Sequence, residues 1–275
     1  MDIKYKLWRL YRLIFKPCAL EINLVSHCNL NCVSCTHYSP IAAKSFLDLD
    51  QFKISLSYLS KISHSFKILR LLGGEPLLHP HINEILQLAG EQLKDKRIEL
   101  YTNGILLDPQ RNNKISERFW EICKQYNIII YFTLYPVQID HEEIIKVCRQ
   151  KGVKIIIMGD KRNLEGFSLF RLHPNKSGNK LNHYTCSETG CMQLVGNKIY
   201  PCSESAYADY LNDAYGTTFH HTKGDYIEIE QVKHRYSLWL FRLKSKPFCS
   251  YCEFPRPPIA WRHSSRESQE WITKI

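Results

Sequence analysis

Short apolar segments alternate with amphipathic ones as far as residue 158, and this alternation limits the possible folds more than any other feature. Five segments are almost continuously apolar: 20–25, 66–72, 97–102, 128–134 and 153–158. Strands of this kind are buried on both faces, which is typical of a parallel sheet covered by helices. We therefore expect an α/β fold, in which ligands bind at the carboxyl ends of the strands.

The stretches between these segments have helical periodicity. The first helix begins at Asp48 or Asp50, either of which can serve as its N-cap, and runs towards Ser63. Further helices are predicted over 82–93, 114–126 and 142–151. Strands that alternate with helices in this way are typical of β/α units in one parallel sheet.

Three cysteines follow the first apolar segment with the spacing Cys28-x₃-Cys32-x₂-Cys35. An iron–sulfur cluster normally takes four cysteine ligands. Three thiolates on a four-iron cluster leave one iron without a protein ligand, and an open coordination position is typical of a metal site that performs chemistry. The alternative is a zinc loop that takes its fourth ligand from His27 or His37. The spacing favours the cluster, because cysteine-rich zinc sites favour C-x₂-C pairs.

Two polar motifs follow the second and third apolar segments. They consist of Gly73, Gly74, Glu75 and Pro76 (GGEP) and of Thr102, Asn103 and Gly104 (TNG). Because the carboxyl ends of parallel strands meet at one edge of a sheet, we expect both motifs to lie beside the three cysteines.

The pattern changes from about residue 160, where helical periodicity fades. Five cysteines gather beyond this point: Cys186, Cys191, Cys202, Cys249 and Cys252. Segment 191–202 is predicted to be a β-hairpin that turns at Gly196 and Asn197, with its terminal cysteines opposite each other. Two distant cysteine pairs that close on one another are typical of a small cluster or a zinc site in a region with little core.

The other cysteines, Cys18, Cys123 and Cys148, each stand alone in an apolar stretch, and we expect them to be buried thiols. No apolar run approaches the roughly 20 residues that span a bilayer, and the N-terminal stretch lacks the uncharged core of a secretory signal. We therefore expect a cytoplasmic protein whose 11 cysteines do not form disulfides and whose grouped cysteines serve metal sites.

The formal net charge is +10, but the basic residues are spread along the chain, which argues against a nucleic-acid partner. Residues 1–17 form a basic amphipathic segment that Pro17 ends. Its predicted apolar face consists of Ile3, Leu7, Leu10, Tyr11 and Ile14. Such a helix can make weak contact with an anionic membrane surface. We favour the alternative, that it packs against the end of the sheet.

The cysteine spacing, GGEP and YTNG (101–104), in this order and each after a predicted strand, resemble the motifs of the radical S-adenosylmethionine (SAM) superfamily. The resemblance implies a partial (β/α)₆ barrel over residues 18–165, with the basic helix of residues 1–17 before it. Residues 166–275 resemble the small cysteine-rich auxiliary-cluster region of some members, which is called twitch or, in its longer form, SPASM.

The resemblance also implies a set of cofactors. Cys28, Cys32 and Cys35 would hold a 4Fe–4S cluster whose vacant iron binds SAM. An electron donor such as flavodoxin or ferredoxin would reduce this cluster, and SAM would be cleaved to a 5′-deoxyadenosyl radical that takes hydrogen from a substrate. GGEP would contact the methionine amino group, and Thr102 and Asn103 would also bind the cofactor. Many members carry an aromatic residue just before the third cysteine, where this chain has Ser34.

In the C-terminal region, one auxiliary 4Fe–4S cluster is implied. Its ligands would be Cys202, Cys249 and Cys252, with either Cys186 or Cys191 as the fourth. A core of this size with one auxiliary cluster is similar to the 2-deoxy-scyllo-inosamine dehydrogenases, which implies dehydrogenation or rearrangement of a small polar substrate such as a sugar or an aminocyclitol.

The alternatives are a ribosomal-peptide maturase and a non-enzymatic zinc or iron–sulfur scaffold. Catalytic side chains are not assigned. Possible substrate contacts at strand ends are Tyr101, Tyr131, Tyr135 and Arg171.

Overall fold

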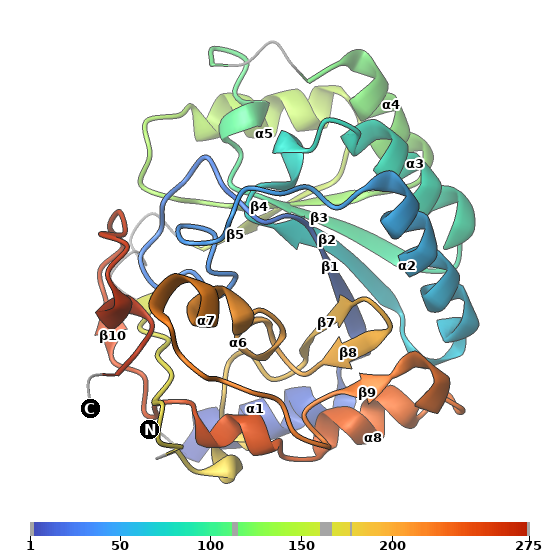
Figure 1. The fold of residues 1–275 in the computed structure, drawn as a ribbon. Coiled ribbons are helices and arrows are strands. Elements are labelled where there is room, and N and C mark those ends of the chain that lie inside the picture. The colour runs from blue at the N-terminus through green and yellow to red at the C-terminus, as the bar shows by residue number, and fades with distance from the viewer. Residues whose placement is uncertain (1–2, 112–114, 160–166, 177, 274–275) are drawn as a thin grey trace.

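Eight strands form one mixed sheet in the computed structural model, which describes residues 3–111, 115–159, 167–176 and 178–273 (Figure 1). The first five strands are parallel neighbours in chain order. They are β1 (Ala19–Val25), β2 (Ile68–Gly73), β3 (Arg97–Thr102), β4 (Ile129–Thr133) and β5 (Ile155–Met158). The α/β fold and the curved, partial barrel expected from the alternation are confirmed.

Four helices cover the outer face of this sheet, at the positions that the periodicity predicts (Figure 1). They are α2 (Leu49–Lys61), α3 (Ile82–Gln92), α4 (Glu117–Gln125) and α5 (His141–Gln150). Asp48 is the N-cap of α2, and its side chain accepts a hydrogen bond from the Asp50 amide. The predicted start of α4, residue 114, lies outside the described residues.

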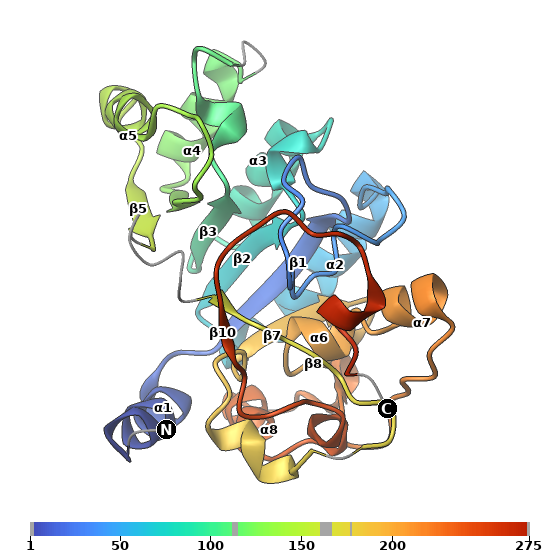
Figure 2. The ribbon, with the colours of Figure 1, turned by 90° about the vertical axis from the view of Figure 1, so that its left-hand side faces the viewer.

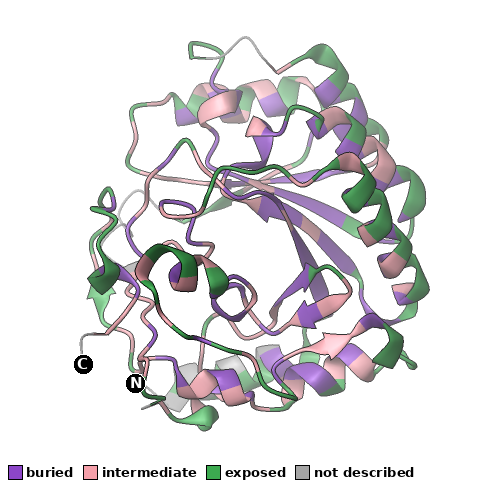
Figure 3. Ribbon diagram, viewed as in Figure 1, coloured by how far each residue is buried: buried purple, intermediate pink, exposed green. Residues whose placement is uncertain are grey.

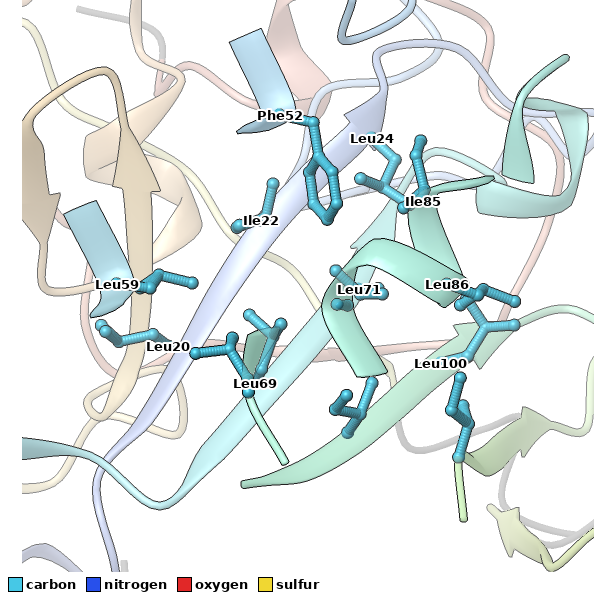
Figure 4. Close-up of a cluster of buried hydrophobic side chains, with 14 of the residues drawn as sticks. Leu20, Ile22, Leu24, Phe52, Leu59, Leu69, Leu71, Ile85, Leu86 and Leu100 are labelled. Atoms are coloured by element: carbon cyan, nitrogen blue, oxygen red, sulfur yellow. The ribbon is translucent and has the colours of Figure 1, made fainter. Parts of the chain in front are cut away.

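Alternate side chains of the strands build the core beneath these helices. Leu20, Ile22 and Leu24 of β1 pack with Leu69 and Leu71 of β2 and with apolar side chains of α2 and α3 (Figure 4). Full burial of one such side chain stabilises the fold by about 1.5–3 kcal/mol. Figure 3 shows that the strands are buried on the inside of the fold and that the outer faces of the helices are exposed.

A charged layer occupies the opposite face of the same strands. Arg70 of β2 lies 2.7 Å from a carboxylate oxygen of Glu21 in β1 and 3.0 Å from one of Glu99 in β3. Gln193 also donates a hydrogen bond to Glu21. The strands are buried on both faces, as predicted, but this face carries charged side chains, which are tolerated because neighbouring opposite charges compensate one another inside the barrel.

The predicted hairpin is present, but it belongs to the main sheet. β7 (Cys191–Val195) turns at Gly196 into β8 (Lys198–Tyr200), which pairs with β9 (Ile227–Glu228). On its other side β7 runs parallel to β1, with Cys191 opposite Ala19. The sheet thus crosses the predicted division at residue 165, because β7 covers an edge of β1 that would otherwise be unpaired.

The remaining elements lie on the inner side of the curved sheet and below it (Figures 1 and 2). They are β6 (Phe167–Ser168), which pairs with β10 (Pro258–Ile259), the short helices α6 (Ser203–Ala206) and α7 (Asp209–Tyr215), and α8 (Ser237–Leu243). A second apolar cluster forms among them and includes Tyr38, Phe248 and Trp271.

The N-terminal helix α1 (Ile3–Phe15) packs beside α8, where Trp239 Nε1 donates to the Ile14 carbonyl over 2.8 Å. Packing against this end of the sheet was expected, but through the predicted apolar face. Leu7 and Tyr11 of that face are instead 62% and 59% exposed, and the buried contact is Leu13. Within the described part of the chain, no helix has both the length and the apolar character to cross a bilayer.

Candidate functional site

A cavity of about 250 Å³ opens at the carboxyl ends of β1 to β4. It is lined by residues of all three sequence motifs: Cys28, Cys32, Cys35, Gly73, Gly74, Thr102 and Asn103. Glu75 and Pro76 are buried beside them. The structure therefore brings together the residues that the sequence placed after three successive strands, while their roles as ligands stay predictions.

The two glycines of GGEP allow its backbone to lie directly against the cysteine loop. The Gly74 amide donates to the Val25 carbonyl over 2.7 Å, and the Glu75 amide donates to the His27 carbonyl over 3.1 Å. A Cβ atom at Gly74 would lie 1.9 Å from the His27 carbonyl oxygen, which is an impossible contact. Glycine is thus required at this position for the approach of two loops.

The Glu75 carboxylate is fully buried and joins GGEP to TNG. Its oxygens accept hydrogen bonds from the Thr102 hydroxyl (2.7 Å), the Asn103 amide (2.9 Å) and the Leu77 amide (3.1 Å). Burial raises the Glu75 pKa to about 7, and these three donors oppose the rise. The contact between Glu75 and the cofactor amino group stays a prediction, but the contacts seen here give the carboxylate a second role, which is to hold two loops together.

Asn103 and the cysteine loop supply donors to the first thiol. Asn103 Nδ2 lies 3.5 Å from Cys28 Sγ and 2.7 Å from Asn29 Oδ1, and the Leu30 amide donates to the same sulfur over 3.3 Å. Burial raises the pKa of this thiol, and Glu75 raises it further. Donors to sulfur stabilise a thiolate when a metal is bound, and they tune the redox potential of a cluster.

The end of the chain holds the cysteine loop from the other side. Segment 262–264 pairs with 31–33 through two backbone hydrogen bonds, of 3.0 Å and 2.7 Å, and Trp271 Nε1 donates to the Cys35 carbonyl over 3.1 Å. Reasoning from the sequence missed this contribution. Its only signal was two tryptophans, Trp261 and Trp271, in an otherwise polar tail.

Ser34, which stands where many superfamily members have an aromatic residue, brings another aromatic residue to the cavity. Its hydroxyl accepts a hydrogen bond from the Phe170 amide (2.7 Å) and donates one to the Ser168 carbonyl (3.2 Å). Phe170 lines the cavity, as does Tyr135. An aromatic wall is therefore present, but it comes from segments that are distant in sequence.

The other candidate residues divide into those inside and those outside the cavity. Tyr101 and Tyr135 line it, and Tyr131 stacks on Tyr101 with 4.7 Å between ring centroids. Arg171 instead makes a two-pronged ion pair with Glu253, over 2.6 and 2.8 Å.

The two histidines of the zinc alternative also differ. His37 lines the cavity, and burial lowers its pKa to about 4, whereas His27 packs edge-on against Phe46. Among the described residues, no group of three His, Cys, Asp or Glu side chains could hold a single metal ion.

Four of the five C-terminal cysteines influence one another. Burial raises the pKa of Cys202, and Glu204, Cys252, Cys186 and Cys249 raise it further. The four cysteines come from the loop after residue 184, from the N-cap of α6, and from the 249–252 segment. These segments are therefore close enough for their thiols to act on Cys202.

The fifth C-terminal cysteine, Cys191, is the first residue of β7 in the main sheet. Burial raises its pKa, and the next largest contributions are from Glu21 and Glu188, while Arg70 opposes them. Glu21 and Arg70 of the charged layer are therefore among its neighbours, and Glu204, which also acts on Cys202, raises its pKa as well. The choice between Cys186 and Cys191 as the fourth ligand stays a prediction. Cys191 lies on β7 opposite Ala19 of β1, and Cys186 is among the groups that act on Cys202.

A buried ion pair lies between these four cysteines and the cavity. The Arg256 guanidinium lies 3.7 Å from Glu204 Oε1 and 4.0 Å from the centroid of the Phe170 ring, which lines the cavity. Burial raises the Glu204 pKa to about 7, and Glu188 raises it while Arg256 lowers it. Arg256 thus brings a fixed positive charge between the two groups of cysteines.

Comparison with known proteins gives one family and several partial relatives. Residues 22–159, half of the chain, match the family described as the Radical SAM superfamily. The chain is 38% identical over 91 residues to GTP 3′,8-cyclase of Synechocystis, a match that covers 32% of this chain and 27% of that protein. It is 31% identical over 91 residues to the antilisterial bacteriocin subtilosin biosynthesis protein AlbA of Bacillus subtilis, over 33% of this chain and 19% of AlbA. The chain therefore spans less than a third of the length of these curated relatives.

Among solved structures, BtrN in complex with AdoMet and 2-DOIA has a TM-score of 0.55 to this chain at 17% sequence identity. The superposition covers 86% of this chain and 92% of BtrN. The two proteins share a fold over nearly their whole lengths.

Proposed function

This chain belongs to the radical SAM superfamily, and we propose that it uses SAM to abstract hydrogen from a small polar substrate, in a dehydrogenation or rearrangement of a sugar or aminocyclitol. The observation that carries the proposal is that three cysteines, GGEP and TNG line or border one cavity at the carboxyl ends of the strands. Superfamily membership alone would leave open whether this chain retains a complete site.

The residues present fit a 4Fe–4S cluster and SAM. Three thiols face one cavity, and Asn103 Nδ2 and the Leu30 amide direct donors at Cys28. When bound, the cluster and SAM supply one-electron cleavage and a radical that takes hydrogen from the substrate. The chain's own part is to hold the three sulfurs at one cavity and to keep the loops around them in place. Glu75 does so by joining GGEP to TNG, and residues 262–264 do so from the other side.

We propose that Cys186, Cys202, Cys249 and Cys252 hold an auxiliary 4Fe–4S cluster that accepts an electron from the substrate. When bound, these cofactors would supply oxidation of a carbinol to a carbonyl group, with the hydrogen atom passing to the adenosyl fragment, the hydroxyl proton to a base and the second electron to the auxiliary cluster. The position of Arg256 between the cavity and these cysteines supports this direction of electron flow.

Two observations support a sugar or aminocyclitol. The cavity is lined by aromatic and hydroxyl-bearing residues, among them Tyr101, Thr133 and Tyr135, which suit a small ring with several hydroxyls. BtrN, whose structure contains AdoMet and 2-DOIA, matches this chain over most of its length, whereas the cyclase match covers only 32% of it.

The similarity to AlbA favours peptide modification as the second candidate. The two can be separated by incubating the reconstituted enzyme and reductant with deuterated pools of aminocyclitols, of sugars and of peptides. Deuterium should enter 5′-deoxyadenosine from an aminocyclitol or sugar pool. Transfer from the peptide pool alone would overturn the proposed substrate class, and a GTP arm tests the resemblance to the cyclases.

The largest effect is expected from Cys28→Ala, Cys32→Ala and Cys35→Ala combined. Anaerobically reconstituted wild type should be brown, hold about eight irons and form 5′-deoxyadenosine when reduced with SAM. The triple variant should hold about four irons and lose product formation by on the order of a thousandfold or more. Cys148→Ala, which removes a buried thiol under the sheet, is the control and should keep both properties. Retention of SAM cleavage in the triple variant would contradict the cluster assignment.

A further inference from the structure

We infer that α1 docks this protein on an anionic membrane surface, with the apolar side chains of Leu7, Tyr11 and Phe15 facing the lipid. These three residues, called the outer stripe below, follow one another at every fourth position and therefore lie along one face of the helix. Their exposed fractions are 62%, 59% and 68%. Leu10 (41% exposed) and Trp8 (49% exposed) flank the stripe.

The helix contacts the protein through its other side. Leu13, which is 5% exposed, lies two positions from both Tyr11 and Phe15, so it points about 160° away from them around the helix axis. At the end of α1, Trp239 Nε1 donates to the Ile14 carbonyl and Arg242 donates to the Lys16 carbonyl, each over 2.8 Å. An amphipathic helix in a globular protein normally buries its apolar face. Here that face is turned outward while the helix is held in place by α8.

The positive charge of the α1 segment favours an anionic partner for the outer stripe. The segment from residue 3 to residue 20 contains Lys4, Lys6, Arg9, Arg12 and Lys16 and no Asp or Glu. Two copies of α1 would therefore repel each other if their outer stripes met. An anionic lipid surface attracts this charge, and aromatic and aliphatic side chains beside Lys and Arg are typical of helices that lie in the interface of a bilayer.

A membrane bound to α1 would not cover the cavity at the carboxyl ends of β1 to β4. α1 leads directly into the start of β1, and Figure 2 shows it projecting from that end of the sheet. The cysteine loop follows the other end of β1, a strand of seven residues, which places it about 23 Å away at about 3.3 Å per residue. The neighbouring elements also expose apolar side chains at the α1 end: Leu181, Tyr236 and Leu240. A protein docked there would keep the cavity open to small polar substrates.

The test is co-sedimentation of the full-length, reconstituted protein with lipid vesicles. Vesicles of phosphatidylcholine alone are compared with vesicles that also contain about 30% phosphatidylglycerol, at about 0.1 M and about 0.5 M NaCl. We expect binding to the anionic vesicles at low salt that is at least about tenfold tighter than binding to the neutral ones, and that weakens at high salt.

The variant Leu7→Ser/Phe15→Ser should weaken this binding by on the order of tenfold or more, because both side chains would enter the lipid. Ile54→Ser on α2 is the matched control, since Ile54 is also an exposed aliphatic residue, at 42%, on a different helix. It should bind like wild type. Melting temperature and SAM cleavage in solution should be unchanged in both variants, which separates this inference from the proposed function.

Three outcomes would overturn the inference. They are equal binding of the Leu7→Ser/Phe15→Ser variant and wild type, equal binding to neutral and anionic vesicles, and no vesicle binding by wild type. In the last case, dimers in light scattering that the double variant abolishes would assign the outer stripe to a second copy of the chain. Salt-sensitive binding to an acidic protein such as flavodoxin, lost in the same variant, would assign it to a protein partner.

Discussion

The first group of cysteines lies in one loop, residues 28–35, whereas the second is drawn from three parts of the chain: Cys186, Cys202 and the 249–252 segment. The first group lines a cavity and is held by the ends of β2 and β3 and by the C-terminal segment. In the second group, Cys252 belongs to the inner apolar cluster together with Phe248. An open site suits chemistry on a bound molecule, and a closed one suits structure or electron storage.

The two cysteine groups have one feature in common. Beside each lies a buried glutamate whose pKa is raised to about 7. Glu75 accepts three hydrogen bonds from the loops around the first group. Glu204 faces Arg256 beside the second group, at 3.7 Å. The first glutamate therefore serves to position loops, and the second serves to balance charge.

Cys186→Ala and Cys191→Ala test whether the second group is closed by four thiolates. Cys186→Ala should reduce the iron content from about eight to about four or to a degraded cluster, while SAM cleavage at the first group continues. Cys191→Ala should keep about eight irons, because this thiol faces the charged layer of the barrel. Iron analysis and electron paramagnetic resonance of both variants provide the measurement. Loss of the cluster in Cys191→Ala alone would reverse the assignment.

Glu75→Gln and Glu204→Gln test the difference between the two glutamates. A glutamine at position 75 presents an NH₂ group to at least one of the three donors, so GGEP and TNG should separate. SAM affinity, measured by calorimetry on the reconstituted protein, should fall by on the order of tenfold, equivalent to about 1.4 kcal/mol. Glu204→Gln should leave this affinity unchanged. An equal loss in both variants would mean that the two residues act only through general stability.

Arg256→Met has the smallest expected effect, a shift in the reduction potential of the auxiliary cluster. A positive charge near a cluster favours its reduced form, so its loss should lower the potential by on the order of 50–100 mV. The measurement is a potentiometric titration in the background of the triple variant Cys28→Ala/Cys32→Ala/Cys35→Ala, so that only one cluster contributes. Arg256→Lys keeps the charge and should stay close to wild type. An unchanged potential in Arg256→Met would leave this residue with a packing role.

Much of the fold was predictable because its information is local. The parallel strands, the four outer helices and the turn at Gly196 follow from hydrophobic periodicity and turn chemistry, and they appear within a few residues of the predicted positions. The convergence of the first cysteine group with GGEP and TNG follows from strand direction alone. The charged layer was missed, although its signal was a single charged residue in the middle of each of three successive strands, Glu21, Arg70 and Glu99.

The parts that were not predictable depend on contacts between distant segments. The pairing of β7 with β1, which places Cys191 on the main sheet, has no local signature. The same is true of Ser34, whose hydroxyl positions Phe170. For α1, the sequence identified an amphipathic helix but favoured burial of the wrong face, because a periodic pattern cannot say which side a neighbour will cover.

The sequence by itself determined the superfamily, the order of strands and the first group of cysteines, because strand direction and short motif spacing are carried by adjacent residues. Only the tertiary structure decided which strand pairs with the free edge of β1, which residues enclose the cavity and which face of α1 is left to solvent. Those outcomes depend on packing between segments more than 100 residues apart in the sequence, such as β1 and β7. The free energy of such packing arises only when both segments are in contact, so neither segment's sequence reveals it alone.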